Sequence, residues 1–306
     1  MDRRVGIIGT GWVGTSVAIS TLHSGAADEL WLHDMRTAVA EGEAMDLAHG
    51  AAFYPACTVR VASVEEMRQT QIVVVAAGRG GKPGESRLDL LRDNARVVAE
   101  IGRTLAGFAG TVVLVTNPVD VLTQVMAEAS GLPLERVLGT GTMLDTARLR
   151  QRLGQELQLA TNSIHAQVVG EHGDSEVVLW SGARVGGVPL RDWPGWTPDF
   201  EPRIAHEVRV AAYEVIQRKG ATNHAIGLVT ASLLRCMLRG ERRVLTVSRV
   251  QDGALGLRDV ALSLPTLVGF EGGLRVLEPS MTDAERAQLA HSADVLRQAM
   301  ASLKAN

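Results

Sequence analysis

The chain has 306 residues, 46% of them apolar, and its formal net charge of −3 leaves no broad basic field, which argues against nucleic acid or an anionic membrane as partner. No apolar run approaches the ~18 residues of a spanning helix, and the N-terminus lacks the apolar segment of a secretory signal, so neither is expected. Cys57 and Cys236 form no CxxC pair and join no cluster at metal-ligand spacing, so we expect no metal site and a reducing cytoplasm as the compartment.

Short apolar runs alternate with longer amphipathic stretches in the first half of the chain. Six of the runs predict strands: Val5–Ile8, Glu29–His33, Thr58–Ala62, Gln71–Ala77, Gly110–Thr116 and Val137–Gly139. Four stretches between them have helical spacing: Trp12–Ser24, Thr37–His49, Leu88–Phe108 and Val119–Ser130. The alternation predicts βαβ units, and therefore a doubly wound parallel sheet with helices on both faces.

A glycine-rich turn joins the first predicted strand to the first predicted helix. Gly9 permits a tight turn, Gly11 lets the backbone approach a pyrophosphate, and Gly14 allows the helix to pack closely. Trp12 and Val13 open the helix, where free N–H groups and the positive end of the dipole attract phosphate. This GxGxxG pattern predicts a dinucleotide site, although a glycine turn alone is weak evidence.

A carboxylate strengthens that prediction. Asp34 ends the second predicted strand twenty residues after Gly14, where it can accept hydrogen bonds from the adenosine ribose hydroxyls. The same charge would repel a 2′-phosphate, so NAD is favoured over NADP, and Arg36 leaves a small opening for the phosphorylated cofactor. The alternative, a capping aspartate beside a structural turn, explains less of the pattern.

The pattern changes near Met143, where helices are separated by irregular or hairpin-like stretches such as Val177–Pro189 and Val244–Ser263. The prolines and tryptophans of Trp193–Pro202 predict a loop. We therefore expect an α/β protein with a Rossmann-type domain over residues 1–142 and a mixed α+β catalytic domain over residues 143–306.

One histidine lies between glycines after an apolar run, in the segment Gly170–Ser175. His172 can there face a cavity and exchange a proton near neutral pH. A histidine is more often structural than catalytic, so the assignment of a catalytic role depends on the surrounding residues. Asp145 and Arg148 have three-residue spacing on a predicted helix, which makes them neighbours on one face. They form either a surface ion pair or a pair in which Asp145 orients His172 and Arg148 clamps a carboxylate.

Taken together, these motifs resemble the L-lactate and malate dehydrogenases, and bacterial L-lactate dehydrogenases most. The resemblance covers nearly the whole chain and is carried by segments in the family's order: Gly9–Gly14, Gly84–Arg87, Thr116–Asp120, Leu144–Arg148 and Gly170–Ser175. It implies NAD as the cofactor, a small 2-oxo or 2-hydroxy acid as the substrate, and reversible reduction of pyruvate to L-lactate.

The resemblance also assigns roles to single residues. It implies His172 as the acid/base, Asp145 as its partner, Arg148 as the carboxylate anchor and Asn117 as a contact of the reacting oxygen and the cofactor. Further residues implied at the site are an arginine that polarises the carbonyl, a residue lining the substrate pocket and a residue near the nicotinamide: Arg87, Thr222 and Ile226. Arg87 would act from a glycine-rich loop over roughly residues 78–90, which suits a hinge.

Substrate choice in the resembled family depends on that loop, where Gly81 stands in place of the glutamine of lactate enzymes or the arginine of malate enzymes. The missing arginine argues against malate, because a buried unpaired carboxylate is costly. Pyruvate is therefore expected, while the space left by Gly81 also allows a larger 2-oxo acid. Arg79 could swing inward and restore a preference for an acidic substrate, which keeps malate dehydrogenase as an alternative.

The resemblance further implies a homo-oligomer, a tetramer or a dimer. Arg150 and His165 match an intersubunit site for fructose 1,6-bisphosphate in regulated bacterial enzymes, and equally match polar residues at a subunit contact.

Two other classes of protein share the glycine turn. A non-catalytic NAD-binding scaffold has no need of the His172 set, and an NAD-using glycosidase should bring metal ligands.

Overall fold

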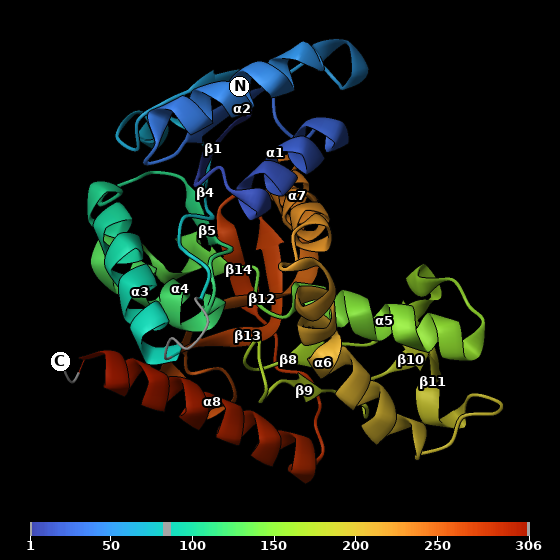
Figure 1. Cartoon of the computed structure of the whole chain (residues 1–306). Coiled ribbons are helices and arrows are strands. Elements are labelled where there is room, and N and C mark those ends of the chain that lie inside the picture. Colours follow the sequence, from blue (N-terminus) through green and yellow to red (C-terminus); the bar gives the residue numbers. More distant parts are fainter. Residues whose placement is uncertain (1, 82–86, 305–306) are drawn as a thin grey trace.

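The computed structural model describes residues 2–81 and 87–304, without the side chain of Arg87. Its centre is a nine-stranded sheet in the order β14-β13-β12-β6-β5-β4-β1-β2-β3. Six of these strands run parallel and come from the first half of the chain: β1 (Arg4–Ile8), β2 (Glu29–His33), β3 (Thr58–Val61), β4 (Ile72–Val75), β5 (Thr111–Leu114) and β6 (Val137–Gly139). The predicted doubly wound parallel sheet is confirmed (Figure 1).

The parallel strands are apolar throughout because helices cover both faces. Strand β4 illustrates this, since Val73 and Val75 join the core on one face and Val74 joins the core on the other. One face carries α1 (Trp12–Ser24) and α7 (His224–Leu238), and the opposite face carries α3 (Arg87–Thr104), α4 (Val119–Ser130) and α8 (Asp283–Lys304) (Figure 1). Helix α2 (Thr37–His49) packs against β3.

Most predicted elements are found within one or two residues of their expected ends. Helix α4 ends as predicted, because Gly131 adopts the left-handed conformation, at φ 62°, and its N–H closes on the carbonyl of Ala127. The strands predicted over 71–77 and 110–116 are shorter, since the last residues leave the ladder at the carboxyl edge of the sheet. Thr116 there turns its hydroxyl to the carbonyl of Ala77 at 2.7 Å and begins the loop that leads to Asn117.

The second half of the chain extends the same sheet with antiparallel strands. Strands β12 (Arg243–Asp252), β13 (Arg258–Gly269) and β14 (Gly272–Val276) form a meander, and β12 joins β6 through Ser248 and Gly139. The sheet therefore continues across the expected boundary at residue 142, and the division into two domains stays a prediction.

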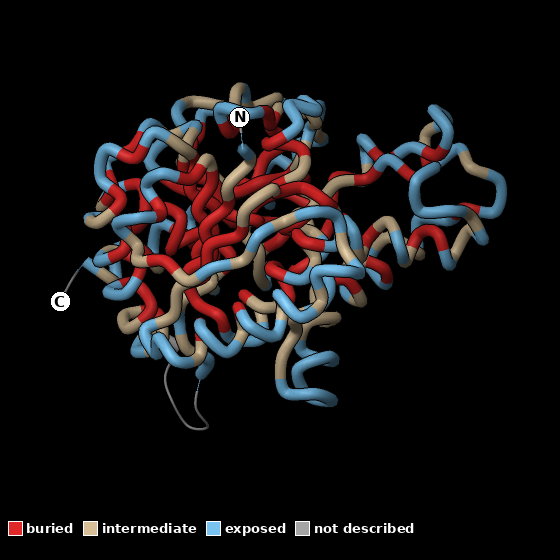
Figure 2. The backbone as a smooth tube through the Cα atoms, turned by 90° about the horizontal axis from the view of Figure 1, so that it is seen from above, coloured by how far each residue is buried: buried red, intermediate tan, exposed pale blue. Residues whose placement is uncertain are grey.

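A lobe beyond the sheet is built from α5 (Met143–Leu157), α6 (Phe200–Lys219) and short strand pairs, and it projects to one side in Figure 2. The short strands are β7 (Ile164–His165), β8 (Val168–Val169), β9 (Val177–Val178), β10 (Arg184–Val185) and β11 (Val188–Pro189). The lobe has its own apolar core, in which Leu149, Ile204 and Trp196 are buried.

The loop expected over Trp193–Pro202 is wrong at its end, because α6 begins at Phe200. Pro202 lies in the first turn of the helix, where backbone N–H groups have no intrahelical partner, so the missing donor costs nothing. The aromatic residues explain the early start: the ring of Trp196 is buried and meets the ring of Phe200 edge-on, with centroids 5.4 Å apart.

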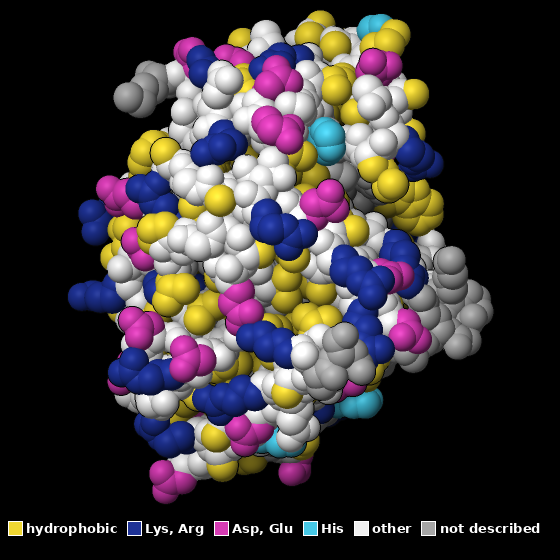
Figure 3. All heavy atoms as spheres, turned by 90° about the vertical axis from the view of Figure 1, so that its left-hand side faces the viewer, with side chains coloured by type: hydrophobic (Ala, Val, Ile, Leu, Met, Phe, Trp, Pro, Cys, Tyr) yellow, Lys and Arg dark blue, Asp and Glu magenta, His cyan; other side chains and the backbone are white. Residues whose placement is uncertain are grey.

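The surface is mixed in charge. Figure 3 views the molecule from the left-hand side of Figure 1, and acidic and basic side chains are interspersed over this face. Within residues 2–81 and 87–304, no helix combines the length and apolar character that crossing a membrane requires. The same residues bring together no group of three or more His, Cys, Asp or Glu side chains suited to a metal ion.

Candidate active site

The space around each glycine of the turn after β1 shows whether a larger residue could replace it. A Cβ at Gly14 would lie 1.8 Å from the carbonyl oxygen of Gly9, and a Cβ at Gly9, whose φ is +93°, would lie 2.6 Å from the backbone of Ala77. Both glycines are thus required by the close approach of α1, the turn and β4. A Cβ at Gly11 would meet nothing within 4 Å, so Gly11 leaves open space in front of the helix.

That space faces the first turn of α1, where Trp12 and Val13 follow Gly11. Gly11 provides no side-chain cap, and the first N–H groups of the helix are available to an outside acceptor. An open approach at Gly11 together with uncapped donors fits the pyrophosphate of a dinucleotide.

Asp34 closes the other end of this region. Its Oδ2 atom accepts the N–H of Thr10 at 3.0 Å, and its Oδ1 atom accepts the N–H of Arg36 at 3.0 Å. Partial burial opposes the charge, but these N–H groups outweigh it and hold the pKa of the Asp34 carboxyl below its usual value. The Arg36 guanidinium is 73% exposed and 3.9 Å from Asp34, so the carboxylate remains the dominant charge facing a ribose.

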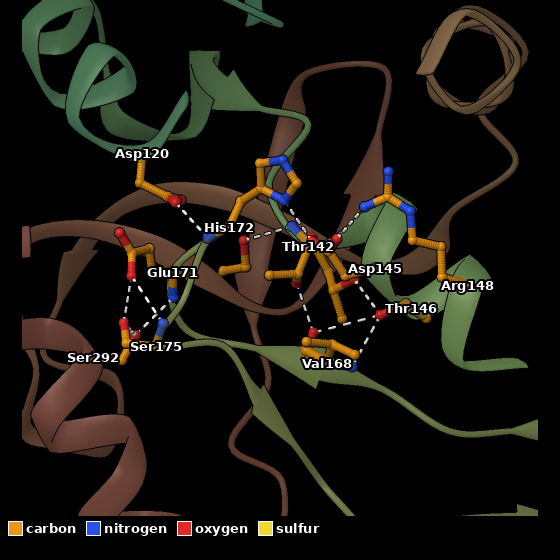
Figure 4. Close-up of polar contacts among 12 residues, drawn as sticks. Asp120, Thr142, Asp145, Thr146, Arg148, Val168, Glu171, His172, Ser175 and Ser292 are labelled. Carbon is orange, nitrogen blue, oxygen red and sulfur yellow. Dashed lines mark hydrogen bonds and ion pairs between the residues drawn. The ribbon is translucent and has the colours of Figure 1, made fainter. Parts of the chain in front are cut away.

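The residues predicted to be catalytic come from two segments that lie far apart in the sequence. His172 Nδ1 lies 2.5 Å from Asp145 Oδ2, and Arg148 donates to Asp145 Oδ1 at 2.8 Å (Figure 4). Asp145 is 3% exposed, so its two partners provide most of the stabilisation of its charge. With Nδ1 on the carboxylate, the Nε2 atom of the ring is the one that can exchange a proton with a ligand.

Neighbouring charges, acting against burial, set the protonation of these groups. Burial alone would lower the pKa of His172, but the adjacent Asp145 carboxylate overcomes it and raises the pKa from 6.5 to about 9. Burial likewise opposes ionisation of Asp145, and the positive charges of His172 and Arg148 keep the pKa of its carboxyl below the usual range. The pair therefore rests as a carboxylate and an imidazolium near pH 7.

The backbone of His172 is held separately, by Asp120, for which the sequence analysis predicts no role. Its N–H donates to Asp120 Oδ2 at 2.7 Å, from the first turn of α4 (Figure 4). Burial raises the pKa of Asp120 to about 6, although the N–H of His172 opposes that shift. Asp120 lay within a motif already singled out, but only the fold shows that it faces the histidine loop.

Two serines and a glutamate fix the rest of the loop against α8. Glu171 donates its N–H to Ser292 Oγ at 2.8 Å, and its carboxylate accepts the hydroxyl of Ser175 (Figure 4). Gly170 has φ +85°, and a Cβ there would lie 2.7 Å from Ser292 Oγ, so the loop can pass close to α8 only with glycine at this position.

A cavity of about 1350 Å³ lies beside the histidine loop. The predicted residues Asn117, Asp145, Arg148 and His172 all contribute to its wall. The remainder comes largely from α6, α8 and the start of α3. A volume of this size is ample for a small 2-oxo acid.

Other predicted residues lie elsewhere. Gly81, Thr222 and Ile226 do not line this cavity. Gly81 is exposed, and a Cβ there would lie 3.4 Å from Leu90 Cδ2. Ile226 packs with Val13 against the core between α1 and the sheet, at the dinucleotide side of the molecule. The side chain of Arg87 lies outside the described residues, as do Lys82, Pro83, Gly84, Glu85 and Ser86.

Arg150 and His165 come together on the lobe. Arg150 Nε donates to the carbonyl of Ala166 at 3.0 Å, next to the exposed His165. Burial and the positive charge of Arg243 lower the pKa of Arg150. Arg150 is thus bonded to the residue that follows His165, and its charge interacts with that of Arg243.

Comparison with known proteins gives matches along the whole chain. Residues 3–139 match the family model "lactate/malate dehydrogenase, NAD binding domain", and residues 142–306 match "lactate/malate dehydrogenase, alpha/beta C-terminal domain". An L-lactate dehydrogenase of Synechococcus sp. is 43% identical over 97% of this chain and 98% of its own, and one of Thermus aquaticus is 44% identical over 98% and 99%. A minor L-lactate dehydrogenase from Enterococcus mundtii, solved in a ligands-bound form, superposes with a TM-score of 0.96 at 37% identity over 100% and 99% of the two chains.

Proposed function

The chain belongs to the lactate/malate dehydrogenase family, and on that premise we propose that it is an L-lactate dehydrogenase, which interconverts pyruvate and L-lactate with NAD. The observation that carries the proposal is a cavity in which a cationic His172, held by the buried Asp145, lies beside Arg148. Both relatives and the solved neighbour named above are called L-lactate dehydrogenases.

The residues divide the chemistry of carbonyl reduction among them. Arg148 anchors the substrate carboxylate through a two-pronged contact, which fixes the orientation of the C2 carbonyl. His172 gives the Nε2 proton to the oxygen on which negative charge develops, and Asp145 stabilises the imidazolium until then. In the opposite direction, neutral His172 removes the hydroxyl proton of lactate.

The cofactor site is assigned to the turn and helix that follow β1. Gly9, Gly11 and Gly14 with the N–H groups of Trp12 and Val13 hold the pyrophosphate, and Asp34 accepts the ribose hydroxyls. When bound, the nicotinamide cofactor supplies the hydride for reduction or accepts it for oxidation. The ionised Asp34 favours NAD over NADP.

Pyruvate is the expected substrate rather than oxaloacetate. Arg79 is the arginine expected to pair with a second carboxylate in the alternative, and its guanidinium is bound to Asp93 of α3, with Nε and one terminal nitrogen at 3.0 and 2.6 Å. Turning it toward the cavity would break that ion pair. Arg87, implied by the resemblance to polarise the carbonyl, remains part of the proposal.

A compartment, an assembly and an effector site are also proposed. The unpaired Cys57 and Cys236 suit a reducing cytoplasm, and a homotetramer or dimer is the expected assembly. The positive charges of Arg150 and Arg243 beside His165 suit an anion such as fructose 1,6-bisphosphate. Activation by that sugar phosphate, if measured, would identify this cluster as an effector site.

The test is NADH oxidation at saturating cofactor with four 2-oxo acids: pyruvate, oxaloacetate, 2-oxoisocaproate and phenylpyruvate. The proposal requires pyruvate to have the highest kcat/KM. A bulkier acid in first place would show that Gly81 has widened the pocket, and oxaloacetate in first place would implicate Arg79. No turnover with any of them would favour the non-catalytic scaffold.

A further inference from the structure

A buried carboxyl group in the substrate cavity has no role in the chemistry described above. Glu176 follows His172 by four residues, at the end of the same loop, and lines the same cavity. It is 5% exposed, and among the described residues its Oε1 atom, fully buried, has no hydrogen-bond partner. Buried polar atoms are nearly always paired, so an unpaired carboxyl oxygen in a ligand cavity needs an explanation.

The one arginine of α6 that lines the cavity does not pair with Glu176. Arg209 lines the same wall, but its buried Nε atom is also without a partner among the described residues, and no ion pair joins it to Glu176. The cavity wall therefore holds an acid and a guanidinium group that, among the described residues, form no ion pair with each other.

The charged groups around Glu176 determine its state. From α5 come Asp145 and Arg148, from its own loop His172, and from α6 Arg209. The remaining titratable groups of the cavity are on the loop, α6 and α8: Glu171, Asp174, Glu201, Tyr213 and His291. Burial and the negative charge of Asp145 raise the pKa of Glu176 to about 8, against the opposing positive charges. At neutral pH the group is therefore mainly an uncharged carboxylic acid.

The protonation state of Glu176 changes the net charge that an anion meets in the cavity. The four charged groups that act on Glu176 are Asp145, Arg148, His172 and Arg209. With Glu176 uncharged and His172 protonated, these four groups carry a net charge of +2. Ionisation of Glu176 halves that charge and places a second carboxylate near Arg148, where the substrate carboxylate must bind. Glu176 is itself buried, and like charges repel each other strongly where little water separates them.

We propose that Glu176 controls the binding of the substrate. The carboxylate of the substrate binds Arg148 tightly only while Glu176 is itself an uncharged carboxylic acid. The inference rests on the proposed function, because it concerns the same cavity. It adds a second proton requirement to that of His172: both groups must be protonated for a 2-oxo acid to bind tightly.

The experiment compares the wild type with Glu176→Gln, which has the same shape and no charge at any pH. KM and kcat for pyruvate are measured at saturating NADH from pH 6.5 to 9.5. At pH 7 the two proteins should agree within about twofold. From pH 7 to pH 9 the KM of the wild type should rise about tenfold more than that of the variant, since a group of pKa about 8 is then nine-tenths ionised.

Asp174→Asn is the matched control. Asp174 belongs to the same loop and lines the same cavity, but it accepts the hydroxyl of Tyr213 and is exposed to solvent. Removing its charge should leave the wild-type dependence of KM on pH in place. Loss of the dependence in both variants would mean that the loop responds to any change of charge, and it would overturn the proposal.

A binding measurement on the wild type covers the case in which the variant does not fold. Oxamate, an unreactive isostere of pyruvate, is titrated into the enzyme–NADH complex at pH 8.5 in two buffers of different ionisation enthalpy. Uptake of about one proton per site is expected, whereas His172 alone, with a pKa of about 9, would take up about a quarter of a proton.

The outcomes separate the two proposals. A wild type that reduces no pyruvate at any pH contradicts the proposed function. A wild type that reduces pyruvate, with a KM that rises with pH as in Glu176→Gln or with proton uptake near a quarter, overturns the role of Glu176 alone.

Discussion

Replacing Asp145 by asparagine removes one charge from the centre of the site and almost no volume. In the wild type, Asp145 Oδ2 lies 2.5 Å from His172 Nδ1 and holds the imidazole as a cation. The rise of the His172 pKa from 6.5 to about 9 corresponds to about 3 kcal/mol of preferential stabilisation of the protonated ring. Without the carboxylate, burial and the neighbouring Arg148 both act to lower the pKa.

The expected consequence follows from the fraction of protonated histidine. At pH 7.5 the wild type holds about 97% of His172 as imidazolium, and a variant whose pKa falls to 6.5 or below holds about 10% or less. Because reduction needs the proton and oxidation needs the free base, kcat/KM for pyruvate should fall at least tenfold through this effect alone. The orientation of the ring adds a further loss in both directions.

The assay is the pH profile of kcat/KM for pyruvate reduction and for lactate oxidation, with binding of NADH as the control for folding. In the wild type kcat/KM for reduction should fall from about pH 8, where Glu176 ionises, and more steeply above pH 9, where His172 loses its proton; in Asp145→Asn the fall should begin below pH 7. An alkaline limb that stays at its wild-type position in the variant would refute the argument, because another group would then be setting the protonation of His172.

Three further substitutions test the other parts of the site. Arg148→Lys keeps the charge and loses the planar fork, so KM for pyruvate should rise at least about tenfold with NADH binding unchanged; equal KM would show that the substrate carboxylate binds elsewhere. Gly14→Ala places a Cβ 1.8 Å from the carbonyl of Gly9, so the melting temperature and the affinity for NADH should both fall, and a stable variant with normal affinity would contradict the packing. Asp34→Ser removes the charge that opposes a 2′-phosphate while Arg36 remains, so the preference for NADH over NADPH should fall about tenfold or more, measured as the ratio of the two kcat/KM values.

Local patterns predicted the parallel half of the fold closely. Apolar runs at regular spacing, the glycines at the start of α1 and the glycine at the end of α4 are signals carried within a few residues of the element they define. The start of α6 was missed because proline is usually a loop signal, and only the contact between Trp196 and Phe200 shows where the helix begins. The antiparallel extension of the sheet depends on the meeting of β6 and β12, which no local pattern encodes.

The residues of the site likewise divide into those that local spacing predicts and those that only the fold brings together. Asp145 and Arg148 are one turn apart on a helix, so their spacing alone predicted the contact. The bond between the His172 backbone and Asp120 joins residues 52 positions apart, and it appears only when α4 and the loop are brought together by the sheet. Sequence therefore identifies the groups that perform chemistry more readily than those that hold them.

The segment from Glu171 to Glu176 shows why residue type alone could not assign the acids of this loop. Glu171 is tied to Ser175 and fixes the loop, and Asp174 accepts the hydroxyl of Tyr213 near the surface. Glu176, of the same chemical kind, is buried and unpaired beside the anchor for the substrate. A carboxyl group that is paired or solvated keeps its charge, and one that is buried without a donor loses it, so three neighbouring acids can act as a brace, a surface contact and an uncharged wall. Burial and partners, which the fold alone supplies, make that distinction, and for this reason Glu176 is the acid of this loop whose charge should control the entry of the substrate.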